Sequence, residues 1–162
     1  MSGHYEASLH RIESLARPLV FTNGVFDLLH AGHVHCLEEA RKLGEGLVVG
    51  VNSDASARRA NKGPGRPFNS EQHRCCVLAA LRCVDAVFMF DENLPLGLLQ
   101  LVRPDIYVKG NDYQLTALAE ARVMAAWGGR TVLIPRHDGL SLSLIHIPSP
   151  RDKRQSRMPS SA

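Results

Sequence analysis

Two histidines stand three residues apart in a glycine-containing segment, residues 22–33, that follows an apolar run. His30 and His33 flank a small Ala-Gly pair, so both imidazoles can face one bound oxyanion as hydrogen-bond donors. Gly24 and Gly32 allow the backbone to approach a ligand closely. The segment leads into an expected helix, whose first N–H groups and positive dipole end form a natural phosphate site. This pattern predicts stabilisation of charge on a phosphate during its transfer.

The elements that must position this segment alternate between strands and helices. Apolar, β-rich runs predict strands at 19–27, 46–52, 84–90, 105–110 and 130–136. The four intervening connections, three of them clearly helical, contain expected helices at 33–45, 71–82, 94–102 and 116–128. Such alternation implies a parallel sheet with helices on both faces, joined by right-handed crossovers. The expected fold class is α/β, a Rossmann-like doubly wound parallel sheet of about five strands.

The remaining segments of the chain divide it into three parts. Residues 1–18 are expected to form an N-terminal helix, and residues 19–140 the main domain. Within that domain, the polar stretch 53–70 contains the turn signal Gly-Pro-Gly and is expected to be a loop, with Ser70 as the N-cap of the next helix.

The last part, residues 141–162, departs from the alternating pattern, because it has three prolines, is rich in Ser and Arg, and shows no clean period. We interpret it as a disordered tail or as non-native sequence of the kind produced by vector read-through, and exclude it from the fold.

Composition and charge narrow the functional classes. With 162 residues, 44% of them hydrophobic and 22% charged, the chain is long enough for one domain with a real core. The net charge of +3 comes from the tail: four of 19 basic and one of 16 acidic residues lie after Leu140, leaving 15 of each in the body. The body therefore predicts no nucleic-acid or membrane surface. The absence of a membrane-span pattern, a signal-peptide pattern and a disulfide framework favours a cytoplasmic protein with free thiols.

The position of the histidine segment also excludes some nucleotide-binding classes. In open parallel sheets, ligands bind beyond the carboxyl ends of the strands, near the point where strand order reverses, and the first loop after a strand usually lies there. Neither a Walker A lysine motif nor a GxGxxG pattern follows the first strand. A P-loop ATPase and a dinucleotide dehydrogenase are therefore disfavoured.

The histidine segment carries a resemblance to a known family. GVFDLLHAGH, residues 24–33, is similar to the GxFDxxHxGH signature of the cytidylyltransferase-like nucleotidyltransferases. Within that superfamily, further stretches resemble the heptose-1-phosphate adenylyltransferases, at 40–54, 62–69, 74–92 and 103–113. The resemblance covers about residues 17–141. In bacteria this family occurs alone or as the C-terminal half of a bifunctional kinase–adenylyltransferase.

The resemblance implies a reaction and its partners. It implies transfer of AMP from ATP, accompanied by Mg²⁺, to D-glycero-β-D-manno-heptose 1-phosphate, giving pyrophosphate and ADP-heptose for lipopolysaccharide core. The sugar phosphate attacks the α-phosphorus directly, without a covalent enzyme intermediate. The implied partner is a small sugar phosphate. A homodimer, or fusion to a sugar kinase domain in the parent protein, is consistent with the family.

The resemblance also assigns roles to residues. It places His30 and His33 at the triphosphate as catalytic residues. The implied nucleotide-binding residues are Gly24, Val25, Phe26, Asp27, Ala31, Gly32, Lys109 and Asp112. Lys62 and Arg74 are candidates for binding phosphates, and no residue is assigned as a metal ligand.

The residues themselves leave simpler readings open. Asp27 could be simply a turn residue that hydrogen-bonds its own loop, and Lys62 could be a solvated loop lysine. Arg74 could pair with Glu71 one helical turn before it. A zinc site built from His30, His33 and the neighbouring histidine at 35 lacks a fourth ligand with convincing spacing.

One departure from the family pattern puts the activity of this chain in doubt. In the family, a Ser-Thr-Thr stretch follows an Asp-Gly pair and opens a helix that completes the nucleotide pocket. Here Asp138-Gly139 is followed by Leu140-Ser141 and then by the tail.

Three alternatives to the heptose enzyme stay open. The first is a CTP-dependent cytidylyltransferase for glycerol- or another alcohol-phosphate. The second is a non-catalytic nucleotide-binding module, suggested by the broken C-terminus. The third, a flavodoxin-like or response-regulator-like domain, would need different chemistry in the first loop.

Overall fold

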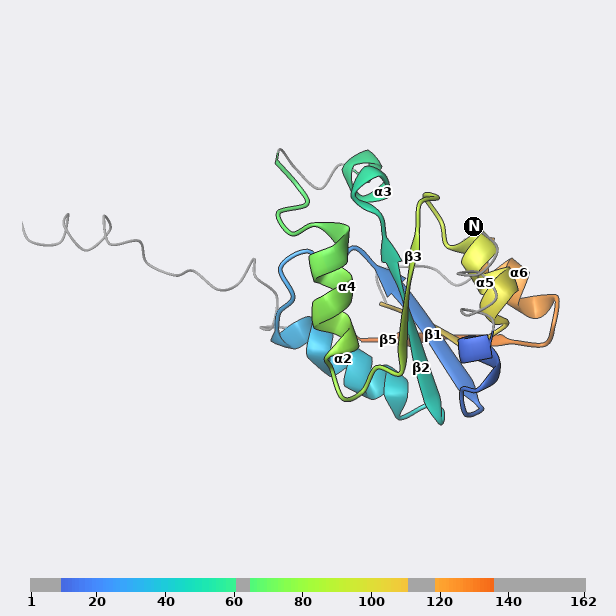
Figure 1. Cartoon of the computed structure of the whole chain (residues 1–162). Helices are drawn as coiled ribbons and strands as arrows, with labels where there is room; N and C mark the ends of the chain where they lie inside the picture. Colours follow the sequence, from blue (N-terminus) through green and yellow to red (C-terminus); the bar gives the residue numbers. More distant parts are fainter. Residues whose placement is uncertain (1–9, 61–64, 111–118, 136–162) are drawn as a thin grey trace, which may run out of the picture.

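The computed structural model describes residues 10–60, 65–110 and 119–135, and within these ranges a five-stranded sheet forms the centre of the molecule (Figure 1). Its strands are β1 (Leu19–Gly24), β2 (Gly46–Asn52), β3 (Ala86–Phe90), β4 (Ile106–Gly110) and β5 (Arg130–Ile134). Every pairing is parallel, and the order is β3-β2-β1-β4-β5. The α/β, doubly wound fold class expected from the sequence is confirmed.

This strand order creates a crevice beside β1. The chain proceeds from β1 through β2 to β3 on one side, then crosses to β4 on the other side of β1. The connection that leaves β1 and the connection that leaves β4 therefore run to opposite sides of the sheet. This reversal of direction leaves an open space at the carboxyl ends of the two strands. Thr22 of β1 faces Val108 of β4 in the pairing register, which brings the following residues of both strands to the same edge.

Helices cover both faces of the sheet. They are α2 (Ala31–Arg41), α3 (Asp54–Arg59), α4 (Glu71–Ala79), α5 (Leu96–Val102) and α6 (Ala119–Ala125), so all four connections between strands contain a helix. In Figure 1, α2 and α4 lie on one side of the sheet and α5 and α6 on the other. Two buried clusters result, one containing Leu37 and Leu78 and the other Leu99 and Met124.

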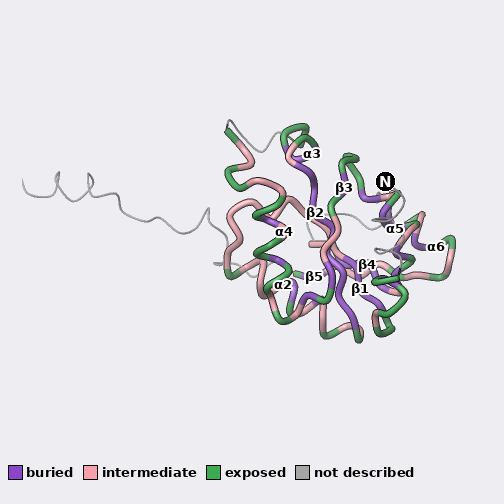
Figure 2. Tube along the Cα trace, in the orientation of Figure 1, coloured by how far each residue is buried: buried purple, intermediate pink, exposed green. Residues whose placement is uncertain are grey.

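Successive residues of the central strands supply both clusters. Phe21 packs in the cluster with α5 and α6, whereas its neighbour Val20 packs in the cluster with α2 and α4. This alternation follows the period of two of a β-strand. All seven residues of β2 are buried, as expected for an inner strand of a parallel sheet, and β2 carries the colour of buried residues in Figure 2.

Most observed element boundaries differ by a few residues from the sequence expectation, and three differences change the assignment of longer segments. The first strand ends at Gly24 rather than Asp27, because Phe26 (φ 52°) and Leu28 (φ 58°) adopt left-handed backbone conformations that end the extended run. The expectation of a loop throughout 53–70 is wrong, because 54–59 forms α3. The Ser53 hydroxyl starts that helix by accepting the N–H of Ser56 at 3.0 Å. In the N-terminal segment, the described helix spans only 10–13.

Some expectations lie outside the described residues. These are Lys62, Asp112 and the tail at 141–162. In the described part of the chain, no helix has the length and apolar character needed to cross a bilayer.

Candidate active site

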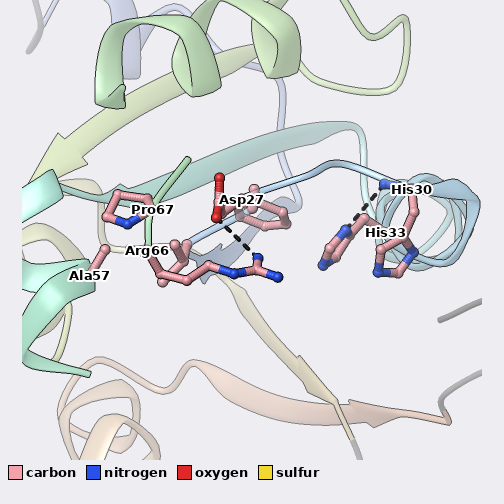
Figure 3. A pocket seen from close by; sticks show the side chains of 8 residues that line it. Asp27, His30, His33, Ala57, Arg66 and Pro67 are labelled. Atoms are coloured by element: carbon pink, nitrogen blue, oxygen red, sulfur yellow. Dashed lines mark hydrogen bonds and ion pairs between the residues drawn. The ribbon is translucent and has the colours of Figure 1, made fainter. Parts of the chain in front are cut away.

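The loop between β1 and α2 forms one wall of a cavity at the carboxyl edge of the sheet (Figure 3). The cavity has a volume of about 210 Å³ and is lined by Val25, Phe26, Asp27, His30, His33, Ala57, Arg66 and Pro67. The structure thus brings together five of the residues that the sequence singled out, all from the GVFDLLHAGH segment, with residues from α3 and the loop before α4.

The two histidines begin α2 as a reciprocal cap. His30 is the N-cap, and its Nδ1 accepts the backbone N–H of Gly32 at 3.1 Å. The Nδ1 of His33 accepts the backbone N–H of His30 at 3.4 Å. The two rings stack with centroids 3.8 Å apart, and the Phe26 ring meets His33 edge to face at 5.5 Å. The side chains therefore occupy fixed orientations at the cavity wall.

This capping decides which histidine nitrogen carries the proton. An imidazole Nδ1 that accepts a hydrogen bond cannot carry a proton, so in each neutral ring the proton lies on Nε2. Each ring therefore offers an Nε2–H donor. The expectation that the first N–H groups of the helix are unpaired is wrong for Gly32, whose N–H donates to His30. The histidine side chains, rather than that N–H, are the donors presented here.

Asp27 holds a second loop against the first. Its carboxylate accepts the backbone N–H groups of Phe68 at 3.0 Å and Asn69 at 3.1 Å, and it pairs with Arg66 at 3.0 Å. The side chain is 4% exposed. Burial by itself would raise the pKa of Asp27, but the N–H donors of Asn69 and Phe68 and the Arg66 guanidinium together lower the pKa below its ordinary value. Asp27 does not merely bond its own turn.

Arg66 is a site residue that the sequence analysis missed. Its guanidinium lies in the cavity wall, paired with Asp27 and 4.6 Å from the ring centroid of the exposed Phe68. Figure 3 shows the Arg66 side chain extending from Pro67 toward the histidines. The only signal for it was a cation just after the Gly-Pro-Gly turn, and its partner lies 39 residues earlier in the chain.

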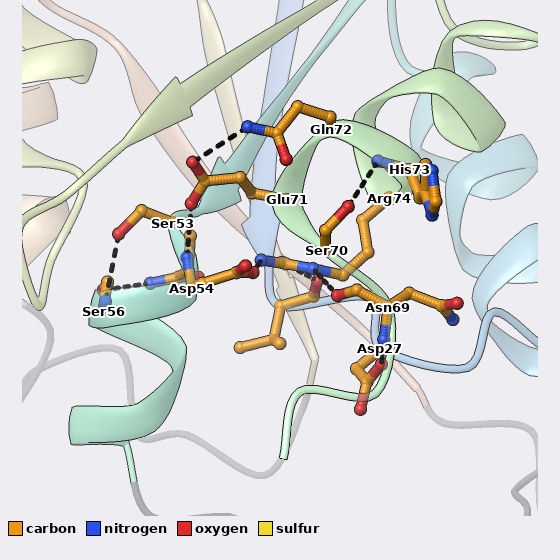
Figure 4. A network of polar contacts seen from close by, with 12 residues as sticks. Asp27, Ser53, Asp54, Ser56, Asn69, Ser70, Glu71, Gln72, His73 and Arg74 are labelled. Atoms are coloured by element: carbon orange, nitrogen blue, oxygen red, sulfur yellow. Dashed lines mark hydrogen bonds and ion pairs between the residues drawn. The ribbon is translucent and has the colours of Figure 1, made fainter. Parts of the chain in front are cut away.

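Arg74 lies behind the cavity wall and joins three segments (Figure 4). Its side chain is 1% exposed. Its Nη1 donates to the carbonyl of Val25 at 2.6 Å, its Nη2 to the carboxylate of Asp54 at 2.7 Å, and its Nε to the carbonyl of Asn69 at 3.1 Å. The simpler reading, a pair with Glu71, is wrong, because the Glu71 carboxylate accepts the N–H of Asp54 at 2.6 Å. These contacts favour a positioning role for Arg74, and direct contact with a phosphate stays a prediction.

Gly24 and Val25 connect these features to the strand. A Cβ on Gly24 would lie 3.1 Å from the Phe26 ring, tighter than ordinary contact, so the small residue lets that ring fold back over the strand end. Val25 lines the cavity and supplies the carbonyl that Arg74 binds. Ala31 is exposed in the first turn of α2.

A buried polar network lies beside the loop, between β1, β4 and α6. The Asn23 side-chain oxygen accepts the hydroxyl of Tyr107 at 2.7 Å and the Lys109 ammonium at 3.3 Å. Glu120 of α6, 3% exposed, lies 3.3 Å from the Tyr107 hydroxyl and 3.9 Å from the Lys109 ammonium. Lys109, predicted as a nucleotide ligand, therefore emerges at the same sheet edge as the histidine loop. The sequence analysis did not single out Glu120.

The donor set for metals is limited in the described ranges 10–60, 65–110 and 119–135. No group of three or more His, Cys, Asp or Glu side chains there is arranged to hold an ion. His35, the third histidine of the zinc site considered from the sequence, is partly buried on α2. The Asp27 carboxylate, which lines the cavity, already accepts N–H groups and pairs with Arg66, so these residues do not form a protein cage for Mg²⁺.

A parallel sheet with a donor-lined cavity at its reversal point is typical of nucleotide-binding α/β domains. The chain belongs to the cytidylyltransferase-like family, whose sequence profile matches residues 21–156. It is 55% identical over 121 residues to a D-beta-D-heptose 1-phosphate adenylyltransferase of Bordetella bronchiseptica, covering 75% of each chain.

Longer relatives match over the same region. The chain is 53% identical to the bifunctional protein HldE of Syntrophotalea carbinolica and 54% identical to that of Streptomyces coelicolor, covering 80% and 83% of this chain. It spans only 26% and 29% of the length of those two proteins.

Solved structures share the fold. A lipopolysaccharide core biosynthesis protein from Thermoplasma volcanium superposes with a TM-score of 0.60 at 32% identity, covering 74% of this chain and 95% of the other. A pantoate-beta-alanine ligase from Francisella tularensis superposes with a TM-score of 0.56 at 19% identity, over 82% of this chain and 66% of the other, which supports the fold alone.

Proposed function

We propose that this chain transfers AMP from ATP to D-glycero-β-D-manno-heptose 1-phosphate, forming ADP-heptose and pyrophosphate. The observation that carries the proposal is the stacked His30–His33 pair, with both Nδ1 atoms engaged by backbone N–H groups at the wall of the cavity beyond β1. The 55% identity to a D-beta-D-heptose 1-phosphate adenylyltransferase supports the choice of substrates.

The proposed reaction is a direct displacement at the α-phosphorus of ATP. A phosphate oxygen of the sugar phosphate forms the new P–O bond, the bond to the β-phosphate oxygen breaks, and pyrophosphate leaves with that electron pair. Negative charge grows on the phosphate oxygens as this occurs. The Nε2–H groups of His30 and His33 donate to those oxygens, and because the cap already fixes the rings, little reorganisation is needed.

The other site residues bind and orient the two anionic substrates. Val25 and Phe26 line the cavity, and Lys109 supplies a cation at the adjacent strand end. Gly24, Ala31 and Gly32 are proposed to contact the nucleotide on the strength of the family resemblance. Asp27 orients the loop 66–69 and, through it, Arg66, and its contact with the nucleotide stays a prediction. Lys62 and Asp112 are proposed to bind phosphate and nucleotide, respectively, on the strength of the family resemblance alone.

Mg²⁺ is proposed to accompany the triphosphate and to neutralise part of its charge when bound. Mg²⁺ in such sites is commonly held through substrate phosphates with one or two carboxylates, not by an all-protein cage. Within the described residues the proposal assigns it no ligand, so every step above is assigned to protein donors.

The assembly in which the reaction occurs is a separate part of the proposal. The edge strand β3 exposes Met89 and the neighbouring helix α4 exposes Val77, at 51% and 50% of their surfaces. The homodimer is proposed on the strength of the family resemblance, with these two side chains as candidate contacts. Fusion to a sugar kinase domain in the parent protein is the alternative that the family resemblance implies, and the greater length of the bifunctional relatives is consistent with it. Light scattering of the purified chain distinguishes monomer from dimer.

The test of the proposed reaction is a pyrophosphate-release assay. The chain is incubated with heptose 1-phosphate and either ATP or CTP, beside a second chain in which a family-like Ser/Thr helix replaces the residues after Ser141. Activity with ATP in both chains supports the proposal and makes the terminal motif dispensable. Activity only in the repaired chain supports it and assigns the loss to the tail.

The remaining outcomes select the alternatives. Turnover with CTP and glycerol 3-phosphate, without turnover of ATP and heptose 1-phosphate, would make the protein a cytidylyltransferase. ATP binding without pyrophosphate release in either folded chain would make it a non-catalytic nucleotide-binding module.

A further inference from the structure

The acidic side chain of Glu120 is buried at the edge of the sheet where ligands bind. It lies on α6, is 3% exposed, and contacts the Tyr107 hydroxyl and the Lys109 ammonium of β4. Burying a carboxylate costs several kcal/mol, and an ion pair recovers that cost only with good geometry. At 3.9 Å the pair with Lys109 is loose. Net stability is therefore a weak explanation for an acid at this position.

The network that Glu120 joins ends at the histidine loop. Tyr107 and Lys109 are two residues apart on β4, so both side chains lie on one face of the sheet, where Tyr107 packs in the same cluster as Met124 of α6. Both donate to the side-chain oxygen of Asn23. Asn23 is the residue before Gly24, where β1 ends and the loop to His30 begins. A continuous set of polar contacts thus runs from α6 to the start of that loop.

We infer that Glu120 is a positioning residue for nucleotide binding, acting through Lys109. The Glu120 carboxylate attracts the Lys109 ammonium from the α6 side, while Asn23 accepts from it on the β1 side. Lys109 is thereby kept at the crevice between β1 and β4, directed at an anionic ligand beside the histidine loop. The inference rests on the proposed function, in which that anion is a phosphate of ATP.

A double-mutant cycle on ATP binding tests this inference. Glu120→Gln keeps the shape and an acceptor for Tyr107 but removes the charge, and Lys109→Met removes the ammonium. Calorimetry with ATP alone, without the sugar phosphate, measures Kd for both single variants and the double variant. We expect Lys109→Met to weaken Kd by roughly tenfold, the scale of one charge-assisted hydrogen bond. We expect Glu120→Gln to weaken Kd by a smaller factor, because it releases the ammonium without removing it. We expect the double variant to be no weaker than Lys109→Met, because Glu120 acts through that side chain.

The control and the readouts separate positioning from stability. Glu45→Gln removes an exposed carboxylate beside the amino end of β2 and should leave Kd unchanged. A lower melting temperature for Glu120→Gln with wild-type Kd would overturn the inference, as would losses that multiply in the double variant. If Glu120→Gln does not fold, Glu120→Asp decides it, because the shorter side chain moves the carboxylate away from Lys109: weakened ATP binding supports the inference and wild-type Kd overturns it.

Failure of the proposed function gives a different result. If the folded wild-type chain binds no ATP, the proposed function fails, whatever the Glu120 variants do. If wild-type chain binds ATP and releases pyrophosphate while the Glu120 variants bind ATP equally well, only the positioning role fails.

Discussion

The rings of His30 and His33 stack 3.8 Å apart, and each accepts a backbone N–H through its Nδ1 atom. Helix capping and orientation of the Nε2–H donors are therefore performed by the same two side chains. A substitution at either position removes a cap contact and a donor together, and experiments must separate these effects.

Replacing either histidine by Ala is expected to lower kcat by roughly 10²–10³-fold, because one donor to the developing phosphate charge is lost. His30→Asn retains an N-cap side chain and should recover helix stability, a term of about 1 kcal/mol, without recovering kcat. Steady-state kinetics and thermal unfolding of the three variants check this. His73→Ala, which removes an exposed histidine on α4, is the matched control. A change confined to KM would instead indicate that the histidine binds the substrate and the transition state equally well.

Asp27→Asn is expected to make stability less dependent on pH in the acid range. The pKa of Asp27 is below its ordinary value of 3.8, so the unfolded chain takes up the proton first as pH falls. The stabilisation is therefore complete above the ordinary pKa and is lost as pH falls through the folded pKa. Urea unfolding should show wild type more stable than Asp27→Asn at neutral pH, with the difference shrinking below pH 3.8. An equal difference in stability between the two proteins at neutral pH and below pH 3.8 would contradict the lowered pKa of Asp27.

Arg74→Met is expected to destabilise the fold by roughly 3 kcal/mol, because a buried ion pair loses one partner and two carbonyls lose their donors. Arg74→Lys should recover only part of this, since an ammonium cannot span the acceptors of a guanidinium fork. Urea titration measures both variants. Arg82→Met, at an exposed arginine just after α4, should change stability by less than about 0.5 kcal/mol. Wild-type stability with a raised KM would instead indicate that Arg74 contacts substrate.

Arg66→Gln is expected to raise KM for the anionic substrates by roughly tenfold or more, because a cation in the cavity wall loses its charge. The difference in KM between wild type and Arg66→Gln should shrink at high salt, because salt screens the partly exposed charge of Arg66 in wild type. Measuring KM for ATP and for heptose 1-phosphate separately shows which anion Arg66 meets. Arg58→Gln, which alters an exposed arginine on α3, is the control and should leave both KM values unchanged.

The sequence was most informative where one local pattern decided the structure. The continuous apolar run at 46–52 became β2 with the expected boundaries, because an inner parallel strand is buried on both faces. Ser70 caps α4 as expected, accepting the N–H of His73. By contrast, α3 has only six residues, too few for a clear period, and its start was marked only by Ser53.

The geometry of the site was harder to predict from the sequence, because it depends on contacts between residues distant in the chain. The loop with His30 and His33 could be located from its spacing, but the reciprocal capping by imidazoles could not, since Ser, Thr, Asp and Asn are the usual caps. Arg66 depends on Asp27 from another loop. Glu120 left a faint signal: it precedes the buried Met124 by four residues, on the same face of α6.

Asp27 links the two walls of the cavity, and the contacts that dock the second wall are separate from the cap that orients the histidines. The histidines belong to α2, whereas Arg66 and Pro67 belong to a loop that Asp27 holds largely through the main-chain N–H groups of Phe68 and Asn69. Main-chain donors are present whatever the side chains are. The side chains at Phe68 and Asn69 can therefore vary, except to proline, without loss of the hydrogen bonds that dock this loop on the histidine loop.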